Sequence, residues 1–230
     1  MESIPADAPK AGMHEEPMAQ VFAVTDAVKS LAEAEAKLNL SRAEESFFEE
    51  WCSALPPISA TEQTALDTIR RRLLYHRADG ELLEGAVTLL VASPLLELAG
   101  FYDPPFKMKA EAAIEIALSD GEEILRGRID ILILQQQLWV MVLESKKTMI
   151  STRSALPQAL VYMMANPNAE KPRFGVLTNG DDIVFIKLVT RPTPQYALSR
   201  AFSIYTVASE LQAAFQVLKR LGEAIANTAA

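Results

Sequence analysis

Apolar and polar residues alternate in the middle of the chain with the period of a β-strand. From Lys107 to Ser119, apolar side chains are interleaved with lysines, glutamates and a serine. Because successive side chains of a strand point to opposite faces of a sheet, this pattern predicts a strand with one buried face. Two following segments, 124–134 and 138–145, are apolar at nearly every position. Such runs are typical of central strands that are covered on both faces.

Helical patterns precede and follow these strands. Thr61 opens a segment whose leucines and isoleucine recur with helical spacing, and Asn179-Gly180-Asp181-Asp182 is a strong hairpin signal between two apolar runs. The order of elements predicts an α/β domain with a mixed central sheet flanked by helices. We expect helices over about 26–38, 41–55, 61–77, 81–92, 155–165 and 206–226, and further strands over 174–178, 183–188 and 196–205.

The first 40 residues are expected to form an appendage to a domain that spans 41–230. Residues 1–20 contain three prolines and no periodicity, which predicts a disordered tail, and 26–38 form a polar, detachable helix. Residues 1–50 hold 11 acidic and 4 basic side chains, whereas the other 180 hold 19 and 18. The net charge of −8 therefore lies mostly in this N-terminal part, and the nearly neutral body remains compatible with a polyanionic partner.

Composition limits the class of protein. Of 230 residues, 50% are hydrophobic and 23% are charged, which is enough for a packed core and excludes wholesale disorder. No apolar run approaches the ~18–20 residues of a membrane-spanning helix, and the N-terminus lacks the features of a signal peptide. The single cysteine, Cys52, excludes an internal disulfide framework and a cysteine-built zinc site. We therefore expect a soluble, cytoplasmic protein without a membrane partner.

Three charged residues stand where the strand pattern demands apolar ones. Asp130 interrupts the second strand, and Glu144 and Lys146 end the third. Buried charges are costly unless they are paired or bound to a metal. If the intervening turn is centred on Gln137, Leu132 faces Val142 and Asp130 faces Glu144. Their Cβ atoms would then be about 4.5–5.5 Å apart, with Lys146 on the same face.

Two carboxylates at that distance repel each other unless a cation lies between them. Mg²⁺ suits this arrangement because it prefers oxygen ligands, keeps several waters and takes only one or two protein carboxylates. The Lys146 ammonium would then orient or deprotonate a water, or stabilise charge on a phosphate. The alternative is a structural pair of carboxylates at a strand end, bridged by Lys146 and Arg128.

Three motifs together resemble the PD-(D/E)XK nuclease superfamily. They are Gly127-Arg128-Ile129-Asp130, Glu144-Ser145-Lys146 and Gln158-Ala159-Leu160-Val161-Tyr162. The Gln-x-x-x-Tyr motif resembles the branch found in the nuclease domains of type I restriction enzyme motor subunits. The segment 174–180 also looks like the strand and turn that follow it there. The resemblance covers about residues 60–190.

This resemblance implies a restriction-endonuclease-like α-β-β-β-α-β core and magnesium-dependent cleavage of DNA, with Mn²⁺ as a substitute metal. Asp130 and Glu144 would hold the metal, Lys146 would serve the attacking water, and Gln158 and Tyr162 would contact DNA or support the site. The sequence departs from the family pattern at two points. An isoleucine precedes Asp130 in place of proline, and no Gly-x-x-x-x-Gly-Lys-Ser/Thr phosphate loop is present. We therefore expect a nuclease without a motor in its own chain.

Other residues are weaker candidates. Glu84 lies where some relatives carry a further acidic residue, although a surface glutamate near a helix start has the same pattern. Lys147 and Arg153 follow the third strand and are either phosphate contacts or solvent-exposed charges. A basic cluster, usually a solvated face, comprises Arg70, Arg71, Arg72, His76 and Arg77.

Three functions remain open at this stage. The leading one is a metal-dependent endodeoxyribonuclease of the restriction type, alone or with a partner restriction or helicase subunit. Cutting both strands would favour a homodimer. The second is a catalytically silent nuclease fold that binds DNA or a protein, which metal binding at Asp130 and Glu144 would distinguish from the first. The third is a nuclease for repair or recombination intermediates, which the sequence does not separate from the first.

Overall fold

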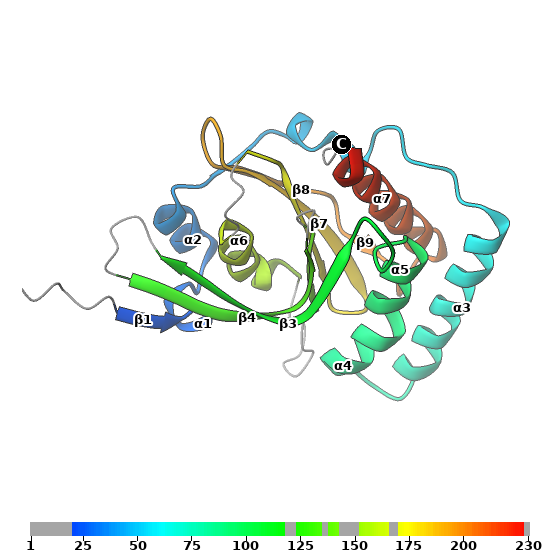
Figure 1. The fold of residues 1–230 in the computed structure, drawn as a ribbon. Helices are drawn as coiled ribbons and strands as arrows, with labels where there is room; N and C mark the ends of the chain where they lie inside the picture. Colours follow the sequence, from blue (N-terminus) through cyan, green and yellow to red (C-terminus); the bar gives the residue numbers. More distant parts are fainter. Residues whose placement is uncertain (1–19, 118–122, 135–137, 143–151, 166–169, 228–230) are drawn as a thin grey trace, which may run out of the picture.

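The computed structural model describes residues 20–117, 123–134, 138–142, 152–165 and 170–227, which form one mixed sheet with helices on both faces (Figure 1). The strands are β1 (Gln20–Ala23), β2 (Ser41–Arg42), β3 (Lys107–Ala117), β4 (Glu123–Leu134), β5 (Leu138–Val142), β6 (Arg173–Thr178), β7 (Asp182–Val189), β8 (Gln195–Leu198) and β9 (Phe202–Ser203). The helices are α1 (Val24–Ala27), α2 (Leu31–Leu38), α3 (Ala60–Arg77), α4 (Glu84–Val87), α5 (Ser93–Leu98), α6 (Leu156–Met164) and α7 (Ala208–Asn227).

The sheet is organised around β4. β3 pairs antiparallel along nearly the whole of this strand. On the other edge of β4, β1 pairs parallel with residues 123–126, and β5 pairs antiparallel with residues 131–133. From β5 the sheet continues through β6, β7 and β8 to β2, with β9 beside β7. Because β5 and β6 are parallel, their carboxyl ends meet at the same end of the sheet.

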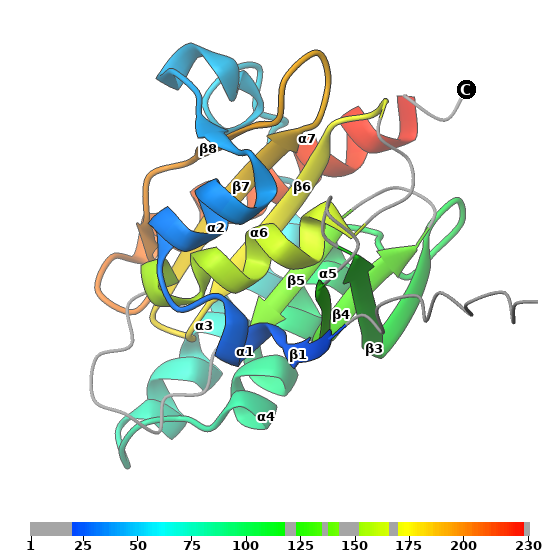
Figure 2. The same cartoon turned by 90° about the vertical axis from the view of Figure 1, so that its left-hand side faces the viewer.

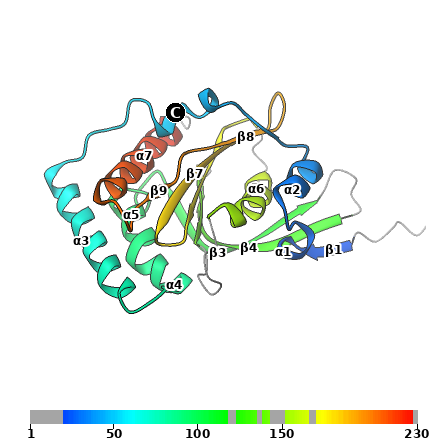
Figure 3. The same ribbon diagram turned by 180° about the vertical axis from the view of Figure 1, so that it is seen from behind.

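Two hydrophobic cores lie on opposite faces of this sheet. Each lies beneath one of the two sets of helices that cover the sheet (Figures 1 and 3). One face is covered by α1, α2 and α6, which we call the α6 layer. The other is covered by α3, α4, α5 and α7, which we call the α3 layer. Neighbouring residues of β6 divide between the cores, since Val176 packs toward the α3 layer and Leu177 toward the α6 layer. Covering both faces explains why the central strands read as continuous apolar runs.

The predicted fold class is confirmed. From α5 through β3, β4, β5, α6 and β6, the chain follows the α-β-β-β-α-β order of a restriction-endonuclease-like core. The predicted hairpin turn joins β6 to β7, and Gly180 adopts a φ of +88°, which glycine reaches without steric strain. None of the helices in the described ranges is long and apolar enough to cross a membrane.

Residues 20–40 pack on the sheet, which differs from the predicted appendage with a boundary at residue 41. β1 pairs with β4, and Val24, Val28, Ala34 and Leu38 are buried in the core of the α6 layer. The Ser30–Glu33 capping box opens α2 as a helix with one buried face. The buried face consists of only a few small or aliphatic side chains, so it is hard to recognise in a segment with so many charged residues. Residues 1–19 lie outside the described ranges.

The helix predicted to begin at Ser41 does not form. Ser41 instead starts β2, where its backbone N–H donates to the carbonyl of Pro194 at 3.1 Å and the strand pairs parallel with β8. Two short 3-10 turns, Glu45–Phe47 and Glu49–Trp51, follow. Long-range strand pairing therefore overrides the local capping pattern.

The helix predicted over 81–92 begins at Glu84 and continues to Leu98 through Pro94. Proline lacks the N–H that an α-helix interior requires, and it normally ends or kinks a helix. Here a π-helical turn, Thr88–Ala92, directly precedes it, and the Ser93 N–H donates to the carbonyl of Thr88 five residues back. The wider turn changes the hydrogen-bond pattern ahead of Pro94, so the helix continues.

Candidate functional site

Asp130 lies in β4, but the predicted register of its hairpin is wrong. Leu132 pairs with Trp139 rather than with Val142, a shift of three positions, and Ile131 pairs with Val140. The sequence offered little to fix this register. Three consecutive glutamines, 135–137, contain no turn-specific residue, and strands that are apolar on both faces carry no alternation.

This register matters because an odd shift exchanges the two faces of a strand. The argument that the hairpin places Asp130 directly opposite Glu144 therefore no longer holds. Glu144, Lys146 and Lys147 lie outside the described residues, as do the side chains of Asp130 and Arg153. The structure fixes the backbone position of Asp130 within the sheet, and the roles of the charged set stay predictions.

The backbone position of Asp130 is distinctive. On one edge of β4, the pairing with β1 covers residues 123–126 and the pairing with β5 covers residues 131–133. Residues 127–130 lie between these two pairings. Asp130 therefore occupies the segment of β4 at which its neighbour on this edge changes from a parallel strand to an antiparallel one.

Tyr162 packs directly on that segment of β4. A Cβ atom placed on Gly127 would lie 2.5 Å from Cε1 and 2.8 Å from Cζ of Tyr162, distances that real Cβ atoms do not reach. Tyr162 is 4% exposed, so its ring is fixed in the core of the α6 layer. Figure 2 shows helix α6 lying across this face of the sheet. The tyrosine of the Gln-x-x-x-Tyr motif thus contacts β4 at Gly127, three residues before Asp130. This close contact requires glycine at position 127.

Gln158 lies one helical turn before Tyr162 on α6. All residues from Leu156 to Met163 except Gln158 are buried, and Gln158 is partly exposed to solvent. The helix is therefore buried on nearly all sides and carries its one partly exposed polar group on the face that it shares with Tyr162. The backbone of Arg153 lies in a 3-10 turn, Thr152–Ala155, immediately before α6.

Glu84 begins the short helix α4, which packs beside the carboxyl end of β6. Val142, the last residue of β5, pairs with Thr178, the last residue of β6. The turn after β6 packs against α4. A Cβ on Gly180 would lie 2.9 Å from Cγ2 of Val87, so helix and turn are in close contact. Glu84 begins this helix three residues before Val87 and is half-buried. The structure thus places Glu84 on the side of the sheet where β5 ends.

An ion pair that the sequence did not reveal holds the same turn. Nε and Nη2 of Arg77 each donate to a carboxylate oxygen of Asp181 at 3.0 Å. This bidentate hydrogen bond with Asp181 raises the pKa of Arg77, opposed by partial burial. Asn179 stiffens the turn further, because its side-chain oxygen accepts from the N–H of Asp181 at 3.0 Å and of Asp182 at 2.8 Å. Arg77 is therefore a structural clamp within the predicted basic cluster.

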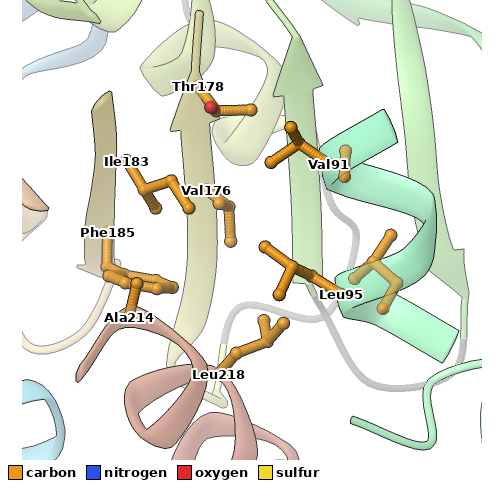
Figure 4. A pocket seen from close by; sticks show the side chains of 10 residues that line it. Val91, Leu95, Val176, Thr178, Ile183, Phe185, Ala214 and Leu218 are labelled. Carbon is orange, nitrogen blue, oxygen red and sulfur yellow. The ribbon is translucent and has the colours of Figure 1, made fainter. Parts of the chain in front are cut away.

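The core of the α3 layer contains a small apolar cavity, of about 20 Å³, beside this turn (Figure 4). Val91, Leu95, Val176 and Leu218 surround it, and Thr178 lies at one end. A space of this size holds about one water, and a lining this apolar offers that water few partners. The cavity is a packing defect of the core and not a substrate site. The described side chains also contain no cluster of three or more histidine, cysteine, aspartate or glutamate residues that could hold a metal ion.

Gly127 and Asp181 are the two residues of this region whose importance the sequence analysis missed. Gly127 begins the Gly127–Asp130 motif, and a lone glycine inside a strand is a known signal of close approach by another group. Asp181 was interpreted only as a turn residue, and its pairing with Arg77, which is 104 residues away in the chain, had no local signal.

The comparisons with known proteins agree with this architecture. No curated protein matches the chain. The family model for the type I restriction enzyme R protein N terminus (HSDR_N) matches residues 25–193, nearly three quarters of the chain. The match includes all three motifs and starts in α1, within the segment that had been predicted to be an appendage. The chain therefore belongs to the family of type I restriction enzyme R protein N-termini and is a restriction-enzyme nuclease-like domain.

Proposed function

We propose that this protein is a divalent-metal-dependent endodeoxyribonuclease that hydrolyses phosphodiester bonds of DNA. The observation that carries the proposal is the family match over residues 25–193, which contains Asp130, Glu144, Lys146, Gln158 and Tyr162 in their expected order. The α-β-β-β-α-β order of the fold supports it, because Gly127–Asp130 then lies on the second strand of the core and Gln158–Tyr162 on the helix that follows the third strand.

The proposed donor set fits Mg²⁺ or Mn²⁺. Asp130 and Glu144 would supply carboxylate oxygens, which such cations prefer, and water would complete the coordination. When bound, the cation would neutralise charge on the scissile phosphate. Lys146 would orient the attacking water, whose oxygen forms the new bond to phosphorus while the bond to the leaving sugar oxygen breaks. The attacking water would lose a proton to solvent, and the leaving oxygen would take one from solvent.

Two further residues would support the site without taking part in bond making. Tyr162 would fix the backbone of β4 through its contact with Gly127, so that Asp130 is held in one position. Glu84 would add negative charge at the same end of the sheet. Gln158, Lys147 and Arg153 would contact the DNA backbone.

A cleavage assay tests the proposal. Purified protein is incubated with plasmid, linear duplex and branched DNA in Mg²⁺, in Mn²⁺ or in a chelator. We expect cleavage only with a metal, and its loss in Asp130→Asn, Glu144→Gln and Lys146→Ala. Glu223→Gln, which removes an exposed carboxylate from α7, is the matched control and should keep full activity.

The outcomes separate the alternatives. Activity that survives Asp130→Asn removes the site itself, and activity undiminished in Lys146→Ala removes its assigned role. If no substrate is cut in either metal although DNA is bound, the fold is a silent binding module. Cleavage restricted to branched DNA would identify a nuclease for recombination intermediates.

The partners proposed with this activity are DNA and either a second copy of the chain or a partner restriction or helicase subunit. A single active site nicks one strand, whereas two sites in a dimer cut both. Plasmid products distinguish these cases, because nicked circles would indicate one site. Linear products that increase with protein concentration would indicate a homodimer.

A further inference from the structure

We propose that the exposed basic surface on the second half of α3, formed by Arg71, Arg72 and Tyr75, binds the phosphate backbone of duplex DNA next to the candidate site. The inference deepens the proposed function and rests on it for the identity of the polyanion. We call these three residues the α3 surface.

The charge of this segment is unusual for an acidic protein. Residues 68–77 contain four arginines and no acidic residue, although the whole chain has a net charge of −8. Two of the arginines have structural partners, since Arg77 pairs with Asp181 and Arg70 donates to the backbone carbonyl of Tyr205 at 3.3 Å. Arg71 and Arg72 are exposed, and neither makes an ion pair or hydrogen bond through its side chain with any other described residue.

Helix stability does not account for these two arginines. Cations stabilise a helix within its last turn, where they interact with the unpaired carbonyl groups. α3 ends at Arg77, so its last turn already contains His76 and Arg77. Arg71 and Arg72 lie five or six residues before the end, beyond the reach of that effect.

Tyr75 adds a second, independent feature to the surface. It is 73% exposed, whereas large aromatic side chains are usually mostly buried. It lies four residues after Arg71 and therefore on the same face of α3. Arginine and tyrosine side chains both donate hydrogen bonds to phosphate oxygens, and such contacts set the position of a protein on DNA.

The α3 surface lies at the end of the sheet that bears the candidate site. The Arg77–Asp181 pair ties the end of α3 to the turn after β6, and Val87 of α4 packs on Gly180 of the same turn. In Figure 1, the carboxyl end of α3 and the start of α4 lie side by side at one edge of the molecule. DNA bound at the carboxyl ends of β5 and β6 would therefore pass close to α3.

Acidic groups near the surface limit its strength. Asp67 precedes Arg71 by one turn, and its carboxylate accepts a hydrogen bond from Gln63 at 2.8 Å. Arg72 lines an open groove between α3 and α5 that also contains Glu97. The binding expected from the α3 surface is thus electrostatic, moderate and strongly salt-dependent.

The test is binding of a fluorescently labelled duplex of about 30 base pairs, measured in chelator between about 50 and 200 mM salt. The double variant Arg71→Gln/Arg72→Gln should lower the slope of log affinity against log salt by about two, since each lost phosphate contact contributes about 0.9. With equal affinities extrapolated to 1 M salt, this corresponds to an affinity loss of about 60-fold at about 0.1 M salt. Tyr75→Phe should weaken binding without changing the slope, because it removes only a neutral donor.

The matched control is Arg42→Gln/Arg191→Gln, which removes the same charge from exposed positions at the β2–β8 edge of the sheet. It should keep both affinity and slope. Binding unchanged in the α3 double variant, or absent in the wild type, overturns the inference, and unchanged affinity in Tyr75→Phe removes Tyr75 from the surface. If the wild type binds through α3 but never cleaves with metal, the nuclease proposal fails and the α3 surface stands.

Discussion

The two helical layers are attached to the same sheet in different ways. The α6 layer is held by close apolar packing, in which helix α6 carries no charged residue and its side chains touch glycines of the strands beneath it. Tyr162 lies on Gly127 of β4. A Cβ on Gly175 of β6 would lie only 2.9 Å from the sulfur of Met163. Bare backbone in the strands lets α6 approach closely.

The α3 layer has an apolar core as well, but polar clamps fix its edges. Lys219 of α7 donates to Glu62 of α3 at 2.7 Å and to the carbonyl of Pro57 at 3.0 Å. At the other end of α3, the guanidinium of Arg77 donates two hydrogen bonds to the carboxylate of Asp181. Each of these contacts joins segments that are far apart in the chain.

The difference assigns separate tasks to the two layers. Close packing has little tolerance for movement, so the α6 layer fixes the backbone of the strand that carries Asp130. The proposed metal site would need that kind of placement by its supporting residues. The α3 layer brings charged groups to the same end of the sheet, where they can meet a polyanion. Three substitutions test this division.

Gly127→Ala should have the largest effect. The added methyl group would overlap a rigid, buried tyrosine ring, and overpacking of a core costs about 1–3 kcal/mol or more. We expect a loss near the upper end, measured as the free energy of unfolding in urea. Metal-dependent DNA cleavage per folded molecule should also fall, because β4 must move to relieve the clash.

Gly85→Ala is the matched control for that substitution. A Cβ at position 85 meets no atom within 4 Å, so alanine there should be neutral or stabilise α4 by about 0.5–1 kcal/mol. The double variant Gly127→Ala/Tyr162→Leu should be less destabilised than the sum of its single variants. Additive losses would show that the contact between α6 and β4 does not set the position of the strand.

Glu62→Gln should have an intermediate effect that depends on pH. The hydrogen bond from Lys219, with the backbone N–H of Ser59, lowers the pKa of Glu62 from 4.5 to about 2. A lowered folded-state pKa stabilises the fold above the unfolded pKa, and this stabilisation is lost as pH falls from about 4.5 toward 2. Hydrogen bonds to charged groups contribute about 1.5–3 kcal/mol, so we expect a loss of about 2 kcal/mol at neutral pH.

Urea unfolding at pH 7 and again near pH 2 measures this dependence. Glutamine keeps the capping hydrogen bond to Ser59, so the variant isolates the charge on Glu62. Glu223→Gln, which removes an exposed carboxylate of α7, should change little at either pH. A Glu62→Gln effect that is the same at both pH values would show that the clamp does not depend on charge.

The sequence predicted the elements of the fold well where one periodicity governed a whole segment. The alternation of 107–117 gave β3, and the apolar runs gave β4 and β5 within a few residues. It failed where a distant segment decided the structure. Ser41 pairs with β8, about 150 residues later in the chain, and so becomes a strand despite its capping pattern.

The candidate site shows the same division. The motif residues and their order can be recognised in the sequence, because charged residues inside apolar runs are conspicuous. The hairpin register was not legible, since Leu132 and its neighbours are equally apolar on both faces. The contact of Tyr162 with Gly127 depends on how α6 crosses the sheet, and no local pattern in either segment encodes that crossing.

Tyr196→Phe should have the smallest of the three effects, and it tests whether the α6 layer depends on packing alone. The Tyr196 hydroxyl in β8 donates to a carboxylate oxygen of Glu35 in α2 at 2.7 Å. This polar link joins the layer to the sheet in addition to the buried hydrogen bond from Arg173 of β6 to the carbonyl of Met163 at 3.1 Å. Glu35 is partly exposed and can regain water, so we expect a loss of about 1 kcal/mol at neutral pH.

Burial, followed by the hydrogen bond to Glu35, raises the pKa of Tyr196 well above 10.0. A raised folded-state pKa gives stability that is fully present below pH 10 and declines as pH rises above it, because only the unfolded chain readily loses the proton. The free energy of unfolding in urea should be measured from pH 8 to 11 for both proteins. The contribution of Tyr196 to its decline should be present in the wild type and absent from the variant. If Tyr196→Phe costs as much as Glu62→Gln at neutral pH, the α6 layer is clamped by polar contacts as strongly as the α3 layer, and the division between the two layers fails.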